Sequence, residues 1–253
     1  MLTIWLYTII SVVIVSLISL IGVFALSLNE NTLKKIIIYF VSFSAGALFG
    51  DAFIHILPES FKLSTPIMVS SGVLSGIVIF FIMEKVIHWR HCHTLTEKRH
   101  IHPVGILNLV GDGVHNFIDG LIVAASYLIS IPLGIATTIA VIAHEIPQEL
   151  GDFGILIHAG FKKKRALLFN LLSALTAVIG AIVGLVIGTH SETIKLFLLP
   201  LAAGGFIYIA GTDLIPEIHK DVCESPQLSR SLLQLLFFIL GIALMFALTL
   251  LEV

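Results

Sequence analysis

GDGVHNFIDG at residues 111–120 and HEIPQELGD at residues 144–152 are the two stretches that decide the fold of this chain. Each lies within an apolar run that is long enough to cross a bilayer. An ionised side chain at mid-membrane costs at least about 2.5–3.5 kcal/mol, so packing alone does not explain such groups. We therefore expect the acidic residues of both stretches to face one another, water or a cation: Asp112, Asp119, Glu145, Glu149 and Asp152.

Helical spacing predicts which of these side chains converge, because residues three or four apart share one face of a helix. In the first stretch this face holds Asp112, His115 and Asp119, with Asn116 beside them. Imidazole nitrogen and carboxylate oxygen together form a ligand set for divalent metals such as Zn²⁺, Fe²⁺ or Mn²⁺.

The second stretch groups its polar residues in the same way. The pairs at helical spacing are His144 with Gln148, Glu145 with Gln148 and Glu149, and Gln148 with Asp152. Two polar faces on neighbouring segments predict a site for a divalent metal between them.

Proline and glycine indicate how these helices pack. Pro147 cannot donate a backbone hydrogen bond, so it leaves the carbonyl of Ala143 exposed, which a membrane helix tolerates beside a polar cavity. The turn Ser130–Pro132 is so short that the two polar segments must be antiparallel neighbours. Gly72 and Gly76 predict close helix packing in another apolar run.

The composition is typical of an integral membrane protein, since 57% of the 253 residues are hydrophobic and 12% are charged. We expect no nucleic-acid partner. Cys92 and Cys223 lie in different polar segments and indicate no disulfide framework. The first 27 residues lack a positive region and exceed the apolar length of a secretory signal, so we expect a retained first helix.

Eight apolar runs are long enough to cross a hydrocarbon layer of about 30 Å. They predict an all-α, polytopic membrane protein with eight transmembrane helices, forming a single domain over residues 1–253. The second, fourth, fifth and seventh runs hold nearly all the intramembrane polar groups. We expect these four to form an inner bundle surrounded by the first, third, sixth and eighth. The runs are 3–27, 36–57, 66–87, 104–129, 133–159, 166–188, 194–215 and 230–251.

Basic residues predict the orientation of the chain. Twelve of the 14 lysines and arginines follow odd-numbered runs, and only Lys62 and Lys195 fall on the other side. By the positive-inside rule, the odd-numbered loops are cytoplasmic and both termini lie outside. The short loops favour a prokaryotic plasma membrane, that is, the cell inner membrane.

Further polar residues lie along the remaining segments. Asp51 and His55 are either a helix-end pair near the outer surface or a third contributor to a cation path. Asp213 and Glu217 flank a proline and are candidates for an exit path.

The segment 88–102 holds five of the eleven histidines, and is either a basic soluble loop or a metal sensor and delivery site. Small polar residues of the sixth run predict interhelical hydrogen bonds, with a supporting role at the site as the alternative: Asn170, Ser173 and Thr176.

These motifs resemble those of the ZIP (Zrt/Irt-like) metal-ion transporters. Residues 115–120, HNFIDG, are similar to the family's fourth-helix motif, HNxxDG or HNxxEG. Residues 144–152 match the HExPHExGD motif of the histidine-rich branch except at Gln148, where that branch has a second histidine. The eight runs, the outside termini and the histidine-rich third loop resemble the family too, so the resemblance covers the whole chain.

The resemblance implies uptake of a divalent metal into the cytoplasm, zinc first, with Fe²⁺, Mn²⁺ and Cd²⁺ as alternatives. It implies ligands for one metal from His115, Asp119 and His144, and for a second from Asn116, Asp119 and Glu145. Gln148 falls on the position of a further ligand, and its amide is a poorer donor than imidazole. Glu149 and Asp152 would be supporting or pathway groups, as would Asp112 by its place on the shared face. A sliding transport bundle and a homodimer are also implied.

Two other functions fit parts of the pattern. His144-Glu145 begins like the HExxH motif of a zinc metalloprotease, but Gln148 stands where that motif needs its second histidine. A proton-coupled transporter of another solute is the second alternative. No ATP-binding motif is present, so we expect transport driven by gradients, with no resident cofactor.

Overall fold

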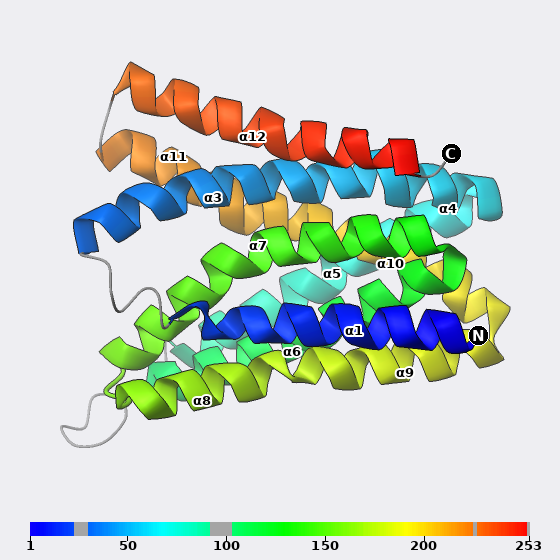
Figure 1. Ribbon diagram of the computed structural model, residues 1–253, viewed down its shortest axis with the longest axis horizontal. Helices are drawn as coiled ribbons and strands as arrows, with labels where there is room; N and C mark the ends of the chain where they lie inside the picture. The colour runs from blue at the N-terminus through cyan, green and yellow to red at the C-terminus, as the bar shows by residue number, and fades with distance from the viewer. Residues whose placement is uncertain (23–29, 92–102, 225–226, 252–253) are drawn as a thin grey trace.

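The computed structural model describes residues 1–22, 30–91, 103–224 and 227–251, and these residues form helices joined by short connections, without strands (Figure 1). The first half of the described chain contains α1 (Leu2–Ile18), α3 (Glu30–Gly50), α4 (Leu57–Leu63), α5 (Pro66–His91) and α6 (Pro103–Ile129). The second half contains α7 (Ile131–His158), α8 (Lys163–Ala174), α9 (Thr176–His190), α10 (Glu192–Ile209), α11 (Ile215–Glu224) and α12 (Leu228–Leu248).

Several of these elements continue one another. A π-helical turn, Asp51–Ile56, joins α3 to α4, and a second one, Ala210–Leu214, joins α10 to α11. Single-turn 3₁₀ segments follow α1 (Ser19–Ile21) and α12 (Thr249–Leu251). Only Leu175 separates α8 from α9, so these two form one long rod.

The chain is an all-α, polytopic membrane protein. Within the described residues, six helical stretches are long and apolar enough to cross a membrane: Leu2–Ile21, Ile37–Leu63, Pro66–Lys85, Lys163–His190, Leu196–Lys220 and Leu228–Leu248. α6 and α7 are not among them, because the polar residues of the two motifs lower their hydropathy, although their 27 and 28 residues exceed the length required.

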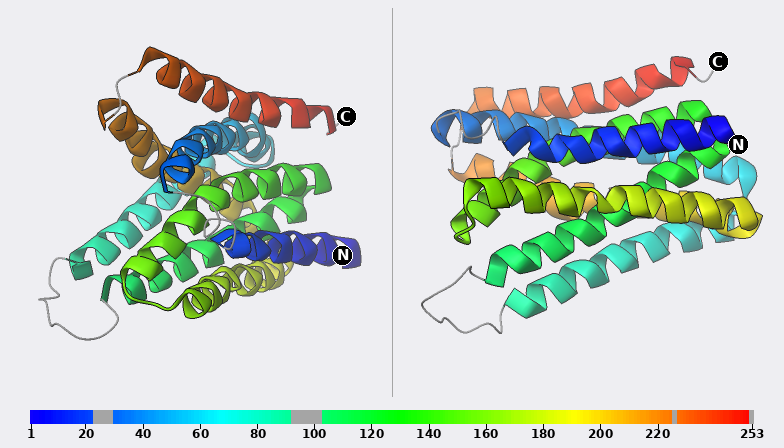
Figure 2. Two further views of the ribbon diagram at one scale, coloured as in Figure 1. Left: turned by 60° about the vertical axis from the view of Figure 1, so that its left-hand side comes forward. Right: turned by 60° about the horizontal axis from the view of Figure 1, so that its bottom comes forward.

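The helices pack side by side, with α7 in the interior. Figure 1 shows α3 and α12 above α7, and α1 and α9 below it; α3, α12 and α1 contact α7, whereas α9 contacts α1 and α6. The stretches Ile37–Leu63 and Leu196–Lys220 are 61% and 56% buried, against 17–44% for the other four. Figure 2 shows that α1 begins and α12 ends at the same end of the bundle.

The antiparallel pair α6–α7 is confirmed. α6 ends at Ile129, and the hydroxyl of Ser130 accepts a hydrogen bond from the backbone N–H of Leu133 (3.2 Å), which caps the start of α7. The two motif helices therefore lie against each other along their length.

Three helix pairs meet through reciprocal glycines. A Cβ at Gly120 of α6 would lie 1.9 Å from the carbonyl oxygen of Ala177, and one at Gly180 of α9 would lie 1.9 Å from that of Phe117. The backbones are thus in direct contact, the geometry that small residues allow in membrane helices. The pairs α5–α10 and α3–α12 repeat this arrangement, with Gly76 and Gly204 in the first and Gly46 and Gly241 in the second. The predicted close packing at Gly72 and Gly76 is confirmed.

The carbonyl that Pro147 frees has a partner from another helix. Ser44 of α3 directs its hydroxyl to the carbonyl oxygen of Ala143 (2.5 Å) and also approaches that of Phe40 (2.7 Å). A backbone acceptor buried in a membrane needs such a donor, so Ser44 anchors α7 one residue before His144.

Gly180→Ala is expected to destabilise the protein by about 1–3 kcal/mol, because its methyl group would collide with the backbone of α6. The matched control is Gly154→Ala in α7, where a Cβ meets nothing within 4 Å. Thermal unfolding in detergent measures both. Equal stability of the two variants would contradict the direct backbone contact.

Ser44→Ala is expected to leave the carbonyl of Ala143 without its side-chain donor and to cost about 1 kcal/mol. Ser42→Ala is the control, since the hydroxyl of Ser42 bonds only within its own helix, to the carbonyl of Ile38 (2.8 Å). The same unfolding assay compares them. A loss no greater at residue 44 than at residue 42 would contradict an anchoring role for Ser44.

Candidate metal site

Four side chains from α6 and α7 converge at one point. His115 and Asp119 are one turn apart on α6, and His144 and Glu145 are consecutive on α7. One ligand atom from each lies within 4.8 Å of all the others, and no other group of three or more such residues does so among the residues described. Asp119, His144 and Glu145 are buried, and His115 is partly buried.

The spacing of the four atoms fits a metal ion at their centre. The Nε2 atoms of His115 and His144 are 3.2 Å apart, and they lie 3.3 and 3.2 Å from Oδ2 of Asp119. Oε1 of Glu145 is 3.6 and 3.7 Å from the same two nitrogens. A tetrahedron of ligands at the usual zinc distances of about 2.0–2.1 Å has edges of about 3.3 Å. The arrangement therefore has nearly the size of a tetrahedral zinc site.

The hydrogen bonds around the cluster leave the ligand atoms that face its centre free to bind a metal. Nδ1 of His144 lies 3.2 Å from the carbonyl oxygen of Ala140, which can only accept, so Nδ1 carries the proton and Nε2 offers its lone pair. Oδ1 of Asp119 and both carboxylate oxygens of Glu145 are buried without a hydrogen-bond partner in the described part of the chain. Buried polar atoms are rarely left so, and a cation would satisfy them.

Aromatic side chains form the apolar wall of the cluster. The ring of Phe80 meets His115 edge-on, with centroids 6.0 Å apart, and Phe206 lies at 6.0 Å from His144. Tyr208, whose ring is 6.4 Å from that of Phe80, donates a hydrogen bond to Glu84 on α5. Sequence reasoning missed this Tyr208–Glu84 pair. The only indication of this pair in the sequence was the single acid Glu84 near the end of the apolar run 66–87.

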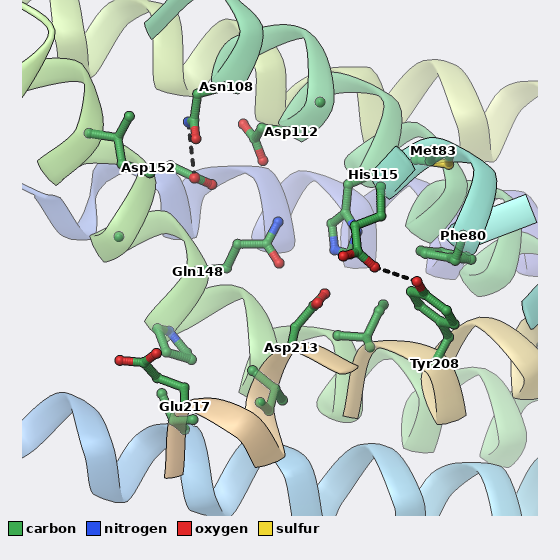
Figure 3. Close-up of a pocket in the computed structure, with 18 residues that line it drawn as sticks. Phe80, Met83, Asn108, Asp112, His115, Gln148, Asp152, Tyr208, Asp213 and Glu217 are labelled. Carbon is green, nitrogen blue, oxygen red and sulfur yellow. Dashed lines mark hydrogen bonds between the residues drawn. The ribbon is translucent and has the colours of Figure 1, made fainter. Parts of the chain in front are cut away.

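A cavity of about 540 Å³ extends from the cluster toward the end of the bundle where α6 begins and α7 ends (Figure 3). Its lining includes six of the thirteen candidate side chains singled out in the sequence: Asp112, His115, Gln148, Asp152, Asp213 and Glu217. In Figure 3, Gln148 lies between Asp152 and His115. Asp213 and Glu217, the predicted exit-path residues, thus line the same cavity as His115 of the cluster.

The remaining candidates lie apart from the four ligand atoms. Asn116 donates to Oδ1 of Asp112 (2.8 Å), and its own side-chain oxygen is buried without a hydrogen-bond partner among the described atoms. Glu149 turns away from the cavity and accepts a hydrogen bond from Asn170 of α8. The expectation that the sixth run supplies interhelical hydrogen bonds is thereby confirmed, and Thr176 adds one to the carbonyl of Gly113 (2.5 Å).

Asp51 and His55 form a buried pair on the other side of the cluster. Nδ1 of His55 lies 3.2 Å from Oδ1 of Asp51 in the π-helical turn after α3. Asp51 is seven residues beyond Ser44, which contacts α7 at Ala143, so the pair lies toward the end of the bundle that holds the chain termini.

Most of the histidine-rich segment 88–102 lies outside the described residues, which end at His91 and resume at Pro103.

Comparison with known proteins shows the family to which the chain belongs. The family described as "ZIP Zinc transporter" matches residues 2–103 and 90–249. The chain is 30% identical over 277 residues to zinc transporter zipt-7.1 of Caenorhabditis briggsae, covering 84% of this chain and 71% of that protein. It is 36% identical over 222 residues to zinc transporter ZIP13 of Pongo abelii (81% and 64%), and 34% identical over 238 residues to zinc transporter YKE4 of Saccharomyces cerevisiae (81% and 68%).

The family match spans nearly the whole chain, and these relatives are transporters. The metalloprotease alternative is therefore wrong, and the chain belongs to the ZIP zinc transporter family, whose members are not enzymes.

Proposed function

We propose that this protein carries a divalent metal cation, zinc first, across the membrane into the cytoplasm through the cluster of α6 and α7. The observation that supports this most directly is the near-tetrahedral set of two imidazole nitrogens and two carboxylate oxygens in a membrane protein. Mixed nitrogen and oxygen ligation without thiolate binds such a cation without trapping it, as transport requires. Fe²⁺, Mn²⁺ and Cd²⁺ suit the same donors.

His115, Asp119, His144 and Glu145 would hold one metal, with the distances given above. A second metal would use Asn116, Asp119 and Glu145, with Asp119 bridging the two. For this, Asn116 would have to turn its amide away from Asp112, to which it donates here. Its side-chain oxygen, which has no hydrogen-bond partner among the described atoms, is the atom that such a turn would offer to the metal.

We propose eight transmembrane helices, adding α6 and α7 to the six apolar stretches, with α3–α4, α6, α7 and α10–α11 forming the inner bundle. The high burial of Ile37–Leu63 and Leu196–Lys220 supports this arrangement. The inner helices would line the metal path, and α1, α5, α8–α9 and α12 would face lipid. The HExPHExGD-like motif would place the chain in the histidine-rich branch of the family.

The cavity would face the cytoplasm. It extends toward the end of the bundle where Lys85 of α5, Lys162 with the first turn of α8, and Lys220 of α11 lie. By the positive-inside rule this end is cytoplasmic, and both termini are outside, in the plasma membrane of a prokaryote. The structure would then be the state open to the inside, and the Asp51–His55 pair would lie on the entry side.

Delivery and coupling complete the proposal. The histidines of residues 88–102 would receive metal on the cytoplasmic side. Proton binding by the ligands of the cluster would compete with the metal and favour its release, and ion gradients would drive transport. A sliding bundle within a homodimer would provide access from each side.

Asp119→Ala is expected to abolish uptake of Zn²⁺ into proteoliposomes, because it removes the carboxylate that lies within 3.3 Å of both imidazoles. Glu59→Gln is the control, since this acid pairs with Lys62 at the surface, away from the cluster (3.0 Å). Uptake is measured for Zn²⁺, Mn²⁺, Fe²⁺ and Cd²⁺, with insertion verified for each variant. Native rates in the Asp119 variant would exclude the cluster, and no uptake of any metal by the folded native chain would favour the transporter of another solute.

Gln148→His is expected to shift the order of preferred metals toward Zn²⁺, because an imidazole beside His115 in the cavity is a better zinc ligand than an amide. Competition between Zn²⁺ and Mn²⁺ in the same vesicles measures the shift. Gln148→Asn keeps an amide and serves as the matched control. An unchanged preference in the histidine variant would remove residue 148 from metal selection.

A further inference from the structure

Two carboxylates outside the cluster are each oriented by an asparagine, and Asp112 also interacts with the side chains of Ser173 and Gln148. Asn116 donates to Oδ1 of Asp112 (2.8 Å), and Asn108 donates to Oδ1 of Asp152 (3.0 Å). The other oxygen of each, Oδ2, is buried and has no hydrogen-bond partner in the part of the chain that is described. Asp112 is only 5% exposed, so water does not replace the missing partner freely.

Both carboxylates face the cavity beside the cluster. Figure 3 shows Asp112 of α6 and Asp152 of α7 directed into the same space, with Gln148 next to them. The two acids are close enough to interact electrostatically, and the amide of Gln148 contacts Asp112. Two acids brought together away from water repel each other unless a proton or a cation lies between them.

The asparagines resemble the supporting residues of metal sites. In such sites, the ligating carboxylate is oriented by a hydrogen bond to its outer oxygen, and its inner oxygen binds the ion. Asn108 and Asn116 have this relation to Asp152 and Asp112.

The available donors are oxygens, without imidazole. Carboxylate and amide oxygens favour hard cations such as Mn²⁺ and bind Zn²⁺ less well than a mixed nitrogen and oxygen set. Asp112 precedes His115 by three residues, which is a rise of about 4.5 Å along α6. A cation leaving the cluster for the cavity would therefore meet these oxygens next.

We propose that Asp112 and Asp152, together with the side-chain oxygen of Gln148, form a separate cation site of oxygen ligands. This oxygen site is distinct from both metal positions of the cluster, and it receives the metal from the cluster. This inference rests on the proposed function, because it adds a step to the same path. The oxygen site binds Zn²⁺ more weakly than the cluster does, which favours onward movement of the metal. It is also the position where Mn²⁺ competes best with Zn²⁺.

The test uses the purified full chain in detergent, loaded with two equivalents of Zn²⁺ so that both proposed positions of the cluster are filled, and then titrated with Mn²⁺. The electron paramagnetic resonance signal of free Mn²⁺ reports how much is bound. The native chain is expected to bind one additional Mn²⁺. The double variant Asp112→Asn with Asp152→Asn is expected to lose at least tenfold in Mn²⁺ affinity and to keep its Zn²⁺ affinity, which also shows that it is folded. Glu59→Gln is the control with one surface acid removed.

Two further variants separate the sites. Asn108→Ala keeps both ligands and removes only the donor to Asp152, so it is expected to weaken Mn²⁺ binding about tenfold or more. His144→Ala is expected to lose Zn²⁺ and to keep Mn²⁺. The histidines of residues 88–102 are common to all variants, so differences between variants report the two sites.

Three results would overturn the inference: no additional Mn²⁺ on the native chain, native Mn²⁺ affinity in the double asparagine variant, or equal loss of both metals in that variant. If Zn²⁺ binds and His144→Ala abolishes it, any of these would leave the proposed function in place. Absence of Zn²⁺ binding by the native chain would instead count against the proposed function itself.

Discussion

The structure depends on a concentration of acidic side chains at the contact of α6 and α7, in the interior of a membrane protein. Asp119 and Glu145 keep oxygen atoms that have no hydrogen-bond partner in the described residues, and two imidazoles face them at 3.2–3.7 Å. Hydrocarbon cannot solvate these groups, so the surrounding helices must shield them from lipid while leaving their lone pairs available. The central position of α7, its short connection to α6 and the aromatic wall of Phe80 and Phe206 meet this requirement.

Three of the acids near the cluster accept a hydrogen bond from an asparagine. Asn116 and Asn170 each donate to one oxygen of a buried acid, Asp112 and Glu149 respectively, and Asn108 donates to the partly buried Asp152. A neutral amide orients a carboxylate without neutralising it. The acids along the path therefore keep their attraction for a cation, which a lysine or arginine in the same place would cancel.

Much of this could be predicted from the sequence, because helical spacing and chain connectivity determine it. The convergence of His115, Asp119 and His144 follows from the periodicity of two helices that one short turn joins. The exposed carbonyl of Ala143 follows from Pro147. The donor from Ser44 could not be predicted in the same way, since it belongs to a helix about a hundred residues earlier, and sequence does not determine how α3 is rotated against α7.

Local geometry also limited the prediction for α7. Gln148 and Glu149 follow Glu145 by three and four residues, which places them about 60° to one side and about 40° to the other. Either could share its face, and only the neighbouring helices decide that Gln148 lines the cavity while Glu149 contacts Asn170. The π-helical turn at Asp51–Ile56 likewise has no simple signal, because spacing alone predicts an ordinary helical pair.

The reciprocal glycines have a consequence for motion. In α6–α9, α5–α10 and α3–α12, each glycine leaves room for a carbonyl of its partner, and a shift by one residue would bring a side chain into that space. Each pair therefore behaves as one rigid body, and relative displacement is easiest between pairs. The contact of α3 with α7, where the hydroxyl of Ser44 meets the carbonyl of Ala143, contains no such glycine among the described residues. A single hydrogen bond of this kind opposes relative displacement less than interlocked backbones do, so the contact between α3 and α7 is a boundary at which these helices can shift against each other.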